Sequence, residues 1–171
     1  LARKLRPEIT GDLRRIYDEL DLPFMPVLAR MERRGVLIET AQLAALSARM
    51  DADITRLTDE IHALAGKPFN LNSPKQLGEV LFEDLKLPTQ GKTGKTKAYS
   101  TAADVLETLA ASHPIAQKIL DYRQLAKLKG TYVDALPELL SPDDGRLHTT
   151  FNPAAAATGR LSSSNPNLQP I

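Results

Sequence analysis

The side chains best suited to molecular recognition lie close to the C-terminus, in residues 157–169, which read ATGRLSSSNPNLQ. This segment holds one guanidinium, on Arg160, several small hydroxyls and amides, and no acidic residue. Such groups donate hydrogen bonds to phosphate or to base edges, but none is a strong general base. Gly159 permits a turn beside Arg160, and Asn167 and Gln169 would share one side of an extended strand. The segment is therefore predicted to bind a ligand and not to catalyse a reaction.

The same residues resemble the TGRLSS…NPNLQ signature of family A DNA polymerases, the family of bacterial DNA polymerase I. The resemblance implies that Arg160 reaches the minor groove near the primer terminus, and that Asn167 and Gln169 donate to minor-groove acceptors. Purine N3 and pyrimidine O2 accept hydrogen bonds at every correctly paired step. Donors placed there would check the geometry of a base pair without reading its sequence.

Three further patches resemble the same family: FNLNS..QL at residues 69–77, YR.L.KLK.TY at residues 122–132, and the strand G.LHT.F at residues 145–151. In the family, the Arg and Lys residues of the second patch grip the primer–template backbone. Together, these patches, the signature segment and the basic loop of residues 90–97 predict contacts to the DNA backbone from Asn70, Asn72, Ser73, Lys75, Lys92, Lys95, Lys97, Arg123, Lys127, Lys129, Thr158, Ser162 and Ser163.

The lysines of residues 90–97 admit another interpretation, because Gly94-Lys95-Thr96 matches the end of a nucleotide-binding P-loop. That motif needs a glycine where Thr89 stands, and it needs a buried strand before the loop. Residues 85–88 are too short for such a strand and end in proline. A flexible basic loop that touches phosphate is the better interpretation.

Hydrophobic periodicity indicates the elements that would position these groups. Between Thr40 and Ala65, apolar residues recur every three or four positions, from Leu43 to Leu64, which predicts one amphipathic helix of about 26 residues and about 39 Å. A helix of that length needs a partner, and residues 114–136 carry a matching stripe. Ser73 is predicted to cap a tip helix, with Gln76 at the reciprocal position, and Asp104 is predicted to complete a capping box near Ser100. Helices are predicted over residues 9–20, 23–34, 40–65, 100–111 and 114–136, and a strand over residues 146–151.

The predicted fold is mostly α: a long antiparallel helical hairpin, resembling a polymerase thumb, with small tip helices and short β-strands from the start of an α+β palm. Gly35 is expected to end the second helix in a left-handed conformation, and residues 141–145 are expected to turn. The domain prediction is entry helices and a short strand over 1–38, the thumb hairpin over 39–136 and the start of the palm over 137–171.

The charge of the chain is unevenly distributed, although the net charge of its 171 residues is only +1. Residues 85–100 contain four lysines and no acid, residues 114–132 contain four bases and one acid, and no acid follows Asp144. Local basic stretches of this kind suit a surface that follows phosphates. On the return helix, Arg123 and Lys127 would share one ridge, and Lys118 and Lys129 another. The absence of cysteine excludes a disulfide framework and a thiolate zinc site.

Polymerase chemistry uses two metal ions held by carboxylates, which in this family follow the Asn-Leu-Gln segment. The chain alone is therefore expected to be inactive and to bind no cofactor, with Mg²⁺ and dNTP bound in the complete enzyme. Its expected partners are primer–template duplex DNA and the remaining palm and fingers of the polymerase. No apolar run approaches the roughly 20 residues of a membrane span, so a cytoplasmic, nucleoid-associated location without membrane contact is expected.

Two other classes of protein remain open from the residues alone. One is a stand-alone, non-catalytic helical arm that binds nucleic acid or partner helices. The other is a purely structural coiled-coil arm. The resemblance favours part of a DNA-directed DNA polymerase that acts in replication and repair.

Overall fold

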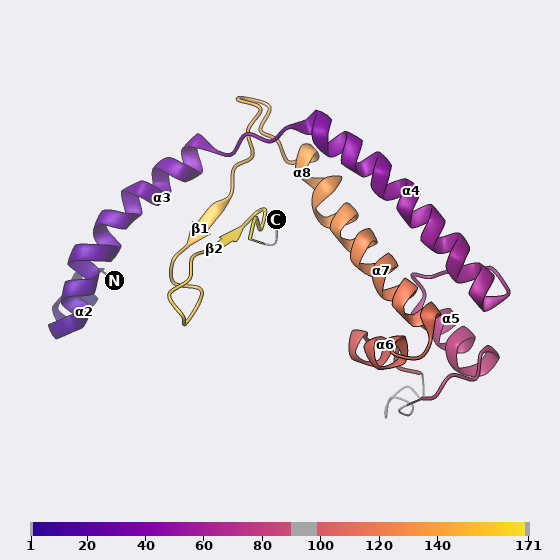
Figure 1. Ribbon diagram of the computed structural model, residues 1–171. Helices are drawn as coiled ribbons and strands as arrows, with labels where there is room; N and C mark the ends of the chain where they lie inside the picture. Colours follow the sequence, from indigo (N-terminus) through magenta and orange to yellow (C-terminus); the bar gives the residue numbers. More distant parts are fainter. Residues whose placement is uncertain (1, 90–98, 170–171) are drawn as a thin grey trace. The chain divides into compact units, whose positions relative to one another are not determined.

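The computed structural model describes residues 2–89 and 99–169. The described chain is mostly helical, with one short two-stranded antiparallel sheet (Figure 1), which confirms the predicted fold class. It forms two compact units. One unit comprises residues 40–135, and the other comprises residues 1–39 together with residues 136–171.

The unit of residues 40–135 is built on a long helical hairpin (Figure 1). Helix α4 spans Thr40–Ala65, the bounds that the hydrophobic periodicity predicts, and it packs against α7, Pro114–Leu128. The return helix then departs from the prediction, because a π-helical segment, η4 at Lys129–Val133, precedes the short helix α8 at Ala135–Glu138. The Asp134 N–H donates to the Lys129 carbonyl, five residues back, at 3.0 Å.

The far end of this hairpin carries α5, Pro74–Gly78, the π-helical segment η3, Glu79–Asp84, and α6, Ala103–Ala110. The Ser73 cap is confirmed: its hydroxyl oxygen accepts the Gln76 N–H at 3.4 Å. The Gln76 side chain, however, accepts the Asn70 N–H at 2.8 Å and not that of the capping residue. The predicted Asp104 capping box is wrong, because α6 starts later, after Ala102, and has no side-chain cap.

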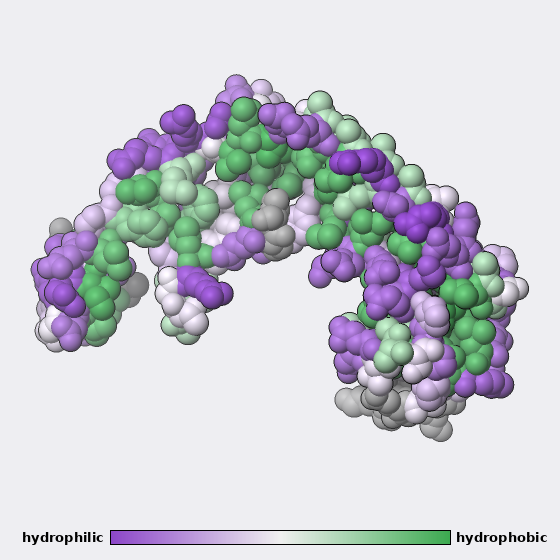
Figure 2. Space-filling view, viewed as in Figure 1, coloured by the Kyte–Doolittle hydropathy of each residue, from purple (hydrophilic) through white to green (hydrophobic). Residues whose placement is uncertain are grey.

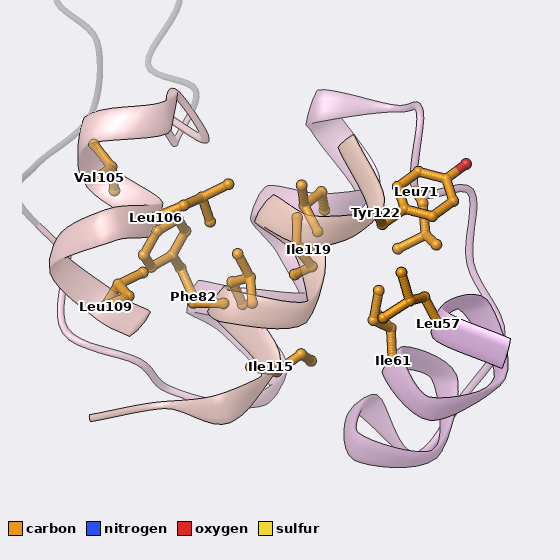
Figure 3. Close-up of a cluster of buried hydrophobic side chains, with 13 residues drawn as sticks. Leu57, Ile61, Leu71, Phe82, Val105, Leu106, Leu109, Ile115, Ile119 and Tyr122 are labelled. Carbon is orange, nitrogen blue, oxygen red and sulfur yellow. The ribbon is translucent and has the colours of Figure 1, made fainter. Parts of the chain in front are cut away.

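One cluster of buried hydrophobic side chains joins α4, α7 and the tip helices (Figure 3). Leu57 and Ile61 of α4 lie on one side of Ile119, while Leu106 of α6 and Phe82 of η3 lie on the other. Burial of this apolar surface is the dominant stabilising contribution in this unit. The cluster consists of Leu57, Ile61, Leu71, Leu77, Leu81, Phe82, Val105, Leu106, Leu109, Ile115, Ala116, Ile119 and Tyr122.

The second unit begins with two helical stretches, which Ile9 and Thr10 separate in extended conformation. The first comprises α1 at Ala2–Leu5 and η1 at Arg6–Glu8. The second is more continuous than predicted and comprises α2 at Gly11–Ile16, the π-helical segment η2 at Tyr17–Asp21, and α3 at Leu22–Arg34. The predicted restart between Asp21 and Pro23 is wrong, because Asp21 keeps helical dihedral angles. Pro23 has no backbone N–H to donate, but the π-helical segment before it keeps the chain helical up to α3.

Strands β1, Thr150–Asn152, and β2, Ser162–Ser164, complete this unit. They pair antiparallel, with Phe151 opposite Ser163. The predicted strand over residues 146–151 is only partly formed: Leu147 pairs with Val36 as an isolated bridge, and regular pairing begins at Thr150. The predicted turn at residues 141–145 is confirmed, with Gly145 at φ 67° and its N–H donating to the Ser141 carbonyl.

Candidate nucleic-acid interface

The loop between β1 and β2 presents the signature arginine. Thr158, Gly159 and Arg160 are all exposed, and Gly159 has a φ of 75°, which a glycine adopts without strain. Among the described residues, Arg160 has no hydrogen-bond or ion-pair partner. A guanidinium with five N–H donors is therefore available to an external acceptor at the end of a short hairpin.

The chain does not remain extended after β2, so the prediction that Asn167 and Gln169 share one side of a strand is wrong. The strand ends at Ser164, Asn165 has a φ of 56°, and the Asn165–Pro166 peptide bond is cis. The Asn167 side-chain oxygen accepts the Ser163 hydroxyl at 3.2 Å and the Gln169 N–H at 3.1 Å. The Gln169 side chain donates to the Leu161 carbonyl.

The two predicted serines lie in β2 and bond within the hairpin. The Ser162 hydroxyl donates to the Asn152 carbonyl at 3.2 Å. Ser163 is buried, and its hydroxyl accepts the Leu168 N–H at 2.9 Å while it donates to Asn167. These hydroxyls therefore set the backbone from which the exposed polar groups project.

Thr149 is a residue of this region that the sequence analysis did not single out. Its side chain is 6% exposed, and its hydroxyl lies 3.0 Å from the Ser164 carbonyl and 2.7 Å from the Pro166 carbonyl. One buried hydroxyl, on the residue before β1, thus binds the chain on both sides of the Asn165 turn. The only signal in the sequence is the inward alternation of Leu147, Thr149 and Phe151, which indicates burial but not a hydrogen-bond partner.

The C-terminal end of α3 is joined to residues 146–151 by the side chains of Arg146 and His148. The Arg146 guanidinium donates to the Arg34 carbonyl at 2.7 Å and to the Gly35 carbonyl at 3.3 Å. The His148 ring lies 2.7 Å from the Glu32 carbonyl through Nδ1 and 3.1 Å from the Asp144 carboxylate through Nε2. Positive groups at the free carbonyls of a helix end are stabilised by the helix dipole.

These contacts shift two pKa values. The hydrogen bond to the Glu32 carbonyl, followed by the contact with Asp144, raises the pKa of His148 above its ordinary 6.5. The backbone N–H of Arg146, followed by His148, lowers the pKa of Asp144 below its ordinary 3.8. Gly35 is required beside this ring, because a Cβ at that position would lie 2.8 Å from His148 Cε1, and its φ of 64° disfavours other residues.

On the return helix, the basic residues differ in how much of their charge is free. Lys127 is exposed and has no partner among the described residues. Arg123 is half-buried and donates to the carbonyl and the hydroxyl of Thr101, and burial lowers its pKa. Arg123 thereby joins the return helix to the residues that lead into α6.

The second predicted ridge faces the partner helix. The Lys129 ammonium is 2.6 Å from Asp134 and 3.2 Å from Asp51 of α4, and its side chain is 15% exposed. The hydrogen bond with Asp134 is the main cause of its raised pKa. Lys118 pairs with Glu60 of α4 in the same way. Both lysines thus form ion pairs between the helices of the hairpin, which the helical spacing alone could not show.

The four predicted contacts at the tip lie on the connection into α5. Asn70 and Asn72 are exposed, the Asn70 side-chain oxygen accepts the Asn72 N–H at 2.9 Å, and Lys75 projects with 85% of its side chain exposed. Ser73 is half-buried and caps α5. The remaining predicted contacts, Lys92, Lys95 and Lys97, lie outside the described residues.

Neither a metal centre nor a membrane span is found in the part of the chain that the structure describes. Within residues 2–89 and 99–169, no group of three or more His, Cys, Asp or Glu side chains could hold a metal ion. No helix in the same ranges is both long enough and apolar enough to cross a bilayer.

Comparison with known proteins identifies the family. The model of DNA polymerase family A matches residues 40–171. The chain belongs to DNA polymerase family A. Over 173 residues it is 53% identical to the thermostable DNA polymerase I of Thermus thermophilus, covering 100% of this chain and 21% of the relative. It is 45% identical to DNA polymerase I of Bacillus subtilis, covering 100% of this chain and 19% of the relative.

The structure of this polymerase segment also has a close counterpart. The POL domain of Pol1 from M. smegmatis, solved in complex with DNA primer-template and dNTP, is 42% identical, with a TM-score of 0.73. The match covers 88% of this chain and 26% of that one. The resemblance to bacterial DNA polymerase I noted in the sequence is therefore confirmed, and the chain spans about a fifth of the length of the curated relatives.

Proposed function

We propose that this chain binds primer–template duplex DNA within a family A DNA polymerase that carries out template-directed nucleotidyl transfer in replication and repair. Residues 39–136 act as the thumb, residues 1–38 as the entry to the palm and residues 137–171 as its start. The metal-binding carboxylates, Mg²⁺ and the dNTP belong to other parts of the polymerase, so the chain alone is inactive. Because its relatives are bacterial, we place its action at the nucleoid in the cytoplasm.

The observation that carries the proposal is the free guanidinium of Arg160 in a segment similar to a polymerase domain solved with primer-template. Arg160 donates to minor-groove acceptors beside the primer terminus, and the amide groups of Asn167 and Gln169 donate next to it. Since these acceptors occur at every correct pair, the contacts favour pairs of correct shape. The match of the whole chain to DNA polymerase I also favours this function over a stand-alone helical arm.

The backbone contacts divide according to the charge that is free. Lys127 binds phosphate through an ammonium that has no partner among the described residues. Lys75, whose ammonium lies 4.0 Å from Glu79 but whose side chain is 85% exposed, also binds phosphate, helped by Asn70, Asn72 and the residues around Ser73. Lys92, Lys95 and Lys97 extend this contact along the basic loop, and Thr158 and Ser162 contribute it in the hairpin. Arg123 and Lys129 contact the backbone with the donors that remain beside their internal bonds. Ser163 already donates its one hydroxyl hydrogen to Asn167, so it contributes by holding the backbone of β2 in place.

The test is primer extension by the complete polymerase with Arg160→Ala. We expect the ratio of kcat/KM for matched over mismatched primer termini to fall about tenfold or more, because a transition-state contact is lost. The Kd for the duplex is expected to change much less. Arg30→Ala, on the exposed surface of α3, is the control. A loss of duplex affinity with no loss of discrimination would contradict the minor-groove role.

A further inference from the structure

The carboxylate side chain of Glu32 bonds to the backbone of β1. Its Oε1 accepts the N–H of Phe151 at 2.7 Å, and its own carbonyl accepts the His148 ring at 2.7 Å. Glu32 is half-buried in the last turns of α3, so side chain and main chain of a single helical residue hold two points of one strand segment.

The register of the sheet explains why Phe151 needs this acceptor. Residues of an antiparallel pair alternate between exchanging both backbone hydrogen bonds and exchanging none. Phe151 lies opposite Ser163, yet its N–H donates to Glu32, so this is the non-bonded pair and the N–H points away from β2. Because the sheet has only two strands, no third strand can accept a hydrogen bond from the Phe151 N–H.

The position of this contact relates it to the signature arginine. Phe151 is one residue before the end of β1, and the loop that carries Arg160 begins after Asn152 and returns at Ser162. Displacement of β1 therefore displaces the base of the loop. Since the loop has few internal bonds, the direction of Arg160 depends on how β1 is held.

We propose that Glu32 is a positioning residue for mismatch discrimination: its carboxylate fixes β1 through the Phe151 N–H and thereby directs Arg160 at the minor groove. The inference rests on the proposed function, in that it requires Arg160 to contact the primer terminus. Glu32 itself touches no DNA. Its effect passes through the hairpin.

The experiment compares Glu32→Ala, Glu32→Gln, Arg160→Ala and the double variant Glu32→Ala/Arg160→Ala in the complete polymerase, with Glu19→Ala as a surface control. Glu32→Ala should reduce the matched-to-mismatched ratio of kcat/KM about tenfold, the scale of loss expected for a misplaced contact. Glu32→Gln retains the acceptor oxygen and should restore most of the ratio. The double variant should be no worse than Arg160→Ala, because Glu32 acts only through Arg160.

Hydrogen exchange at the Phe151 amide provides a second measurement that does not involve DNA. We expect exchange to become at least about tenfold faster in Glu32→Ala and to stay slow in Glu32→Gln. If Glu32→Ala does not fold, Glu32→Asp takes its place. It keeps the charge but withdraws the oxygen by one methylene, and it should behave as the alanine variant does.

The outcomes separate the two proposals. If Arg160→Ala lowers discrimination but Glu32→Ala and Glu32→Asp do not, the positioning role is overturned and the minor-groove function stands. If the effects of Glu32 and Arg160 multiply in the double variant, Glu32 acts by another route and the inference is also overturned. If Arg160→Ala leaves discrimination unchanged, the proposed function fails. Faster exchange at Phe151 in Glu32→Ala would then mean that Glu32 stabilises β1 without any role in discrimination.

Discussion

The unit of residues 40–135 contains a single cluster of thirteen buried hydrophobic side chains, whereas the described part of the other unit buries only three, Leu28, Leu136 and Leu147. In place of a large apolar core, the second unit has buried hydroxyls on Thr149 and Ser163, together with polar bonds from α3 to residues 146–151. Apolar burial is not directional, but hydrogen bonds are. The unit of residues 40–135 is thus stabilised mainly by apolar burial. The hairpin of β1 and β2 is held mainly by directional hydrogen bonds.

The two modes of stabilisation suit different tasks. In the function proposed above, the unit of residues 40–135 follows the DNA backbone, which requires a stable body with free charge on its surface and tolerates small displacements. A group that checks the shape of a base pair needs an exact direction. Variants in each unit therefore test whether apolar burial stabilises residues 40–135 and whether directional hydrogen bonds hold the β1–β2 region.

The largest effect is expected from the core of the arm. Leu106→Ala removes a side chain with 0% exposure and should reduce the free energy of unfolding by about 2–5 kcal/mol, from lost burial and the cavity that remains. Leu64→Ala, at a position 43% exposed, is the matched control and should change it by less than about 1 kcal/mol. Urea denaturation measures both. Equal effects would mean that the cluster is not the main stabilising element.

The stability of the β1–β2 hairpin is expected to fall when the single hydroxyl of Thr149 is removed. Thr149→Val keeps the shape of the side chain but removes the donor that serves the Ser164 and Pro166 carbonyls, at a cost of about 1–3 kcal/mol. Amide exchange of residues 162–168 should accelerate. Thr150→Val, on the exposed neighbour, should leave it unchanged. If both variants behaved alike, the hydroxyl would have no special part in fixing the turn.

Within the unit of residues 40–135, variants of two lysines should distinguish an effect on DNA binding from an effect on stability. Lys127→Ala removes a free charge, so it should weaken duplex binding evenly across sequences and reduce the slope of log K against log salt by about one unit. Lys118→Ala breaks an internal ion pair with Glu60 and should leave that slope nearly unchanged. Fluorescence anisotropy at several salt concentrations gives both slopes. If Lys118→Ala changed the slope and Lys127→Ala did not, Lys118 and not Lys127 would be the residue that binds phosphate.

The smallest effect is a pH dependence in the bonds at the end of α3. Both ring nitrogens of His148 face acceptors, so the imidazolium fits best and its folded pKa is raised. Its stabilising contribution is therefore complete below the unfolded pKa of about 6.5 and is lost as the pH rises through the folded value. The pKa of Asp144 is lowered, so its contribution is lost only as the pH falls through a value below 3.8.

This dependence can be measured as the difference in Tm between the parent chain and His148→Ala. The difference should be largest between about pH 4 and 6.5 and should shrink at higher pH. His113→Ala, which lacks such acceptors among the described residues, provides the control. A difference in Tm that stayed constant across this range would show that the charge of His148 adds nothing to its packing.

Local and periodic signals made part of this fold predictable. The bounds of α4, the Ser73 cap and the turn at residues 141–145 follow from hydrophobic spacing and residue preferences within a few positions. The π-helical segments do not, because a repeat of 3.6 residues cannot reveal where one extra residue is inserted. The start of α6 was missed because the Ser100 hydroxyl accepts the Ala102 N–H, two residues on, before any helix begins.

The candidate site was predictable in its residue types but not in how each group is used. The motif indicates Arg160 as a donor, and the structure leaves it exposed. The same reasoning treats Lys127 and Lys129 alike. Only the structure shows that Lys129 forms an ion pair with Asp51, which lies 78 positions before it in the chain. Glu32 and Thr149 were missed because their partners are backbone groups more than ten residues away, which no local pattern encodes.

The π-helical segments η2, η3 and η4 each close a hydrogen bond five residues back, from Leu22 to Tyr17, Leu85 to Val80 and Asp134 to Lys129. Each holds one residue more per turn than an α-helix would. Deleting that surplus residue restores the ordinary ladder without removing the helix. During evolution, insertions and deletions of one residue can therefore accumulate at these three places, and alignments of polymerase sequences should show single-residue gaps there more often than in the unbroken length of α4.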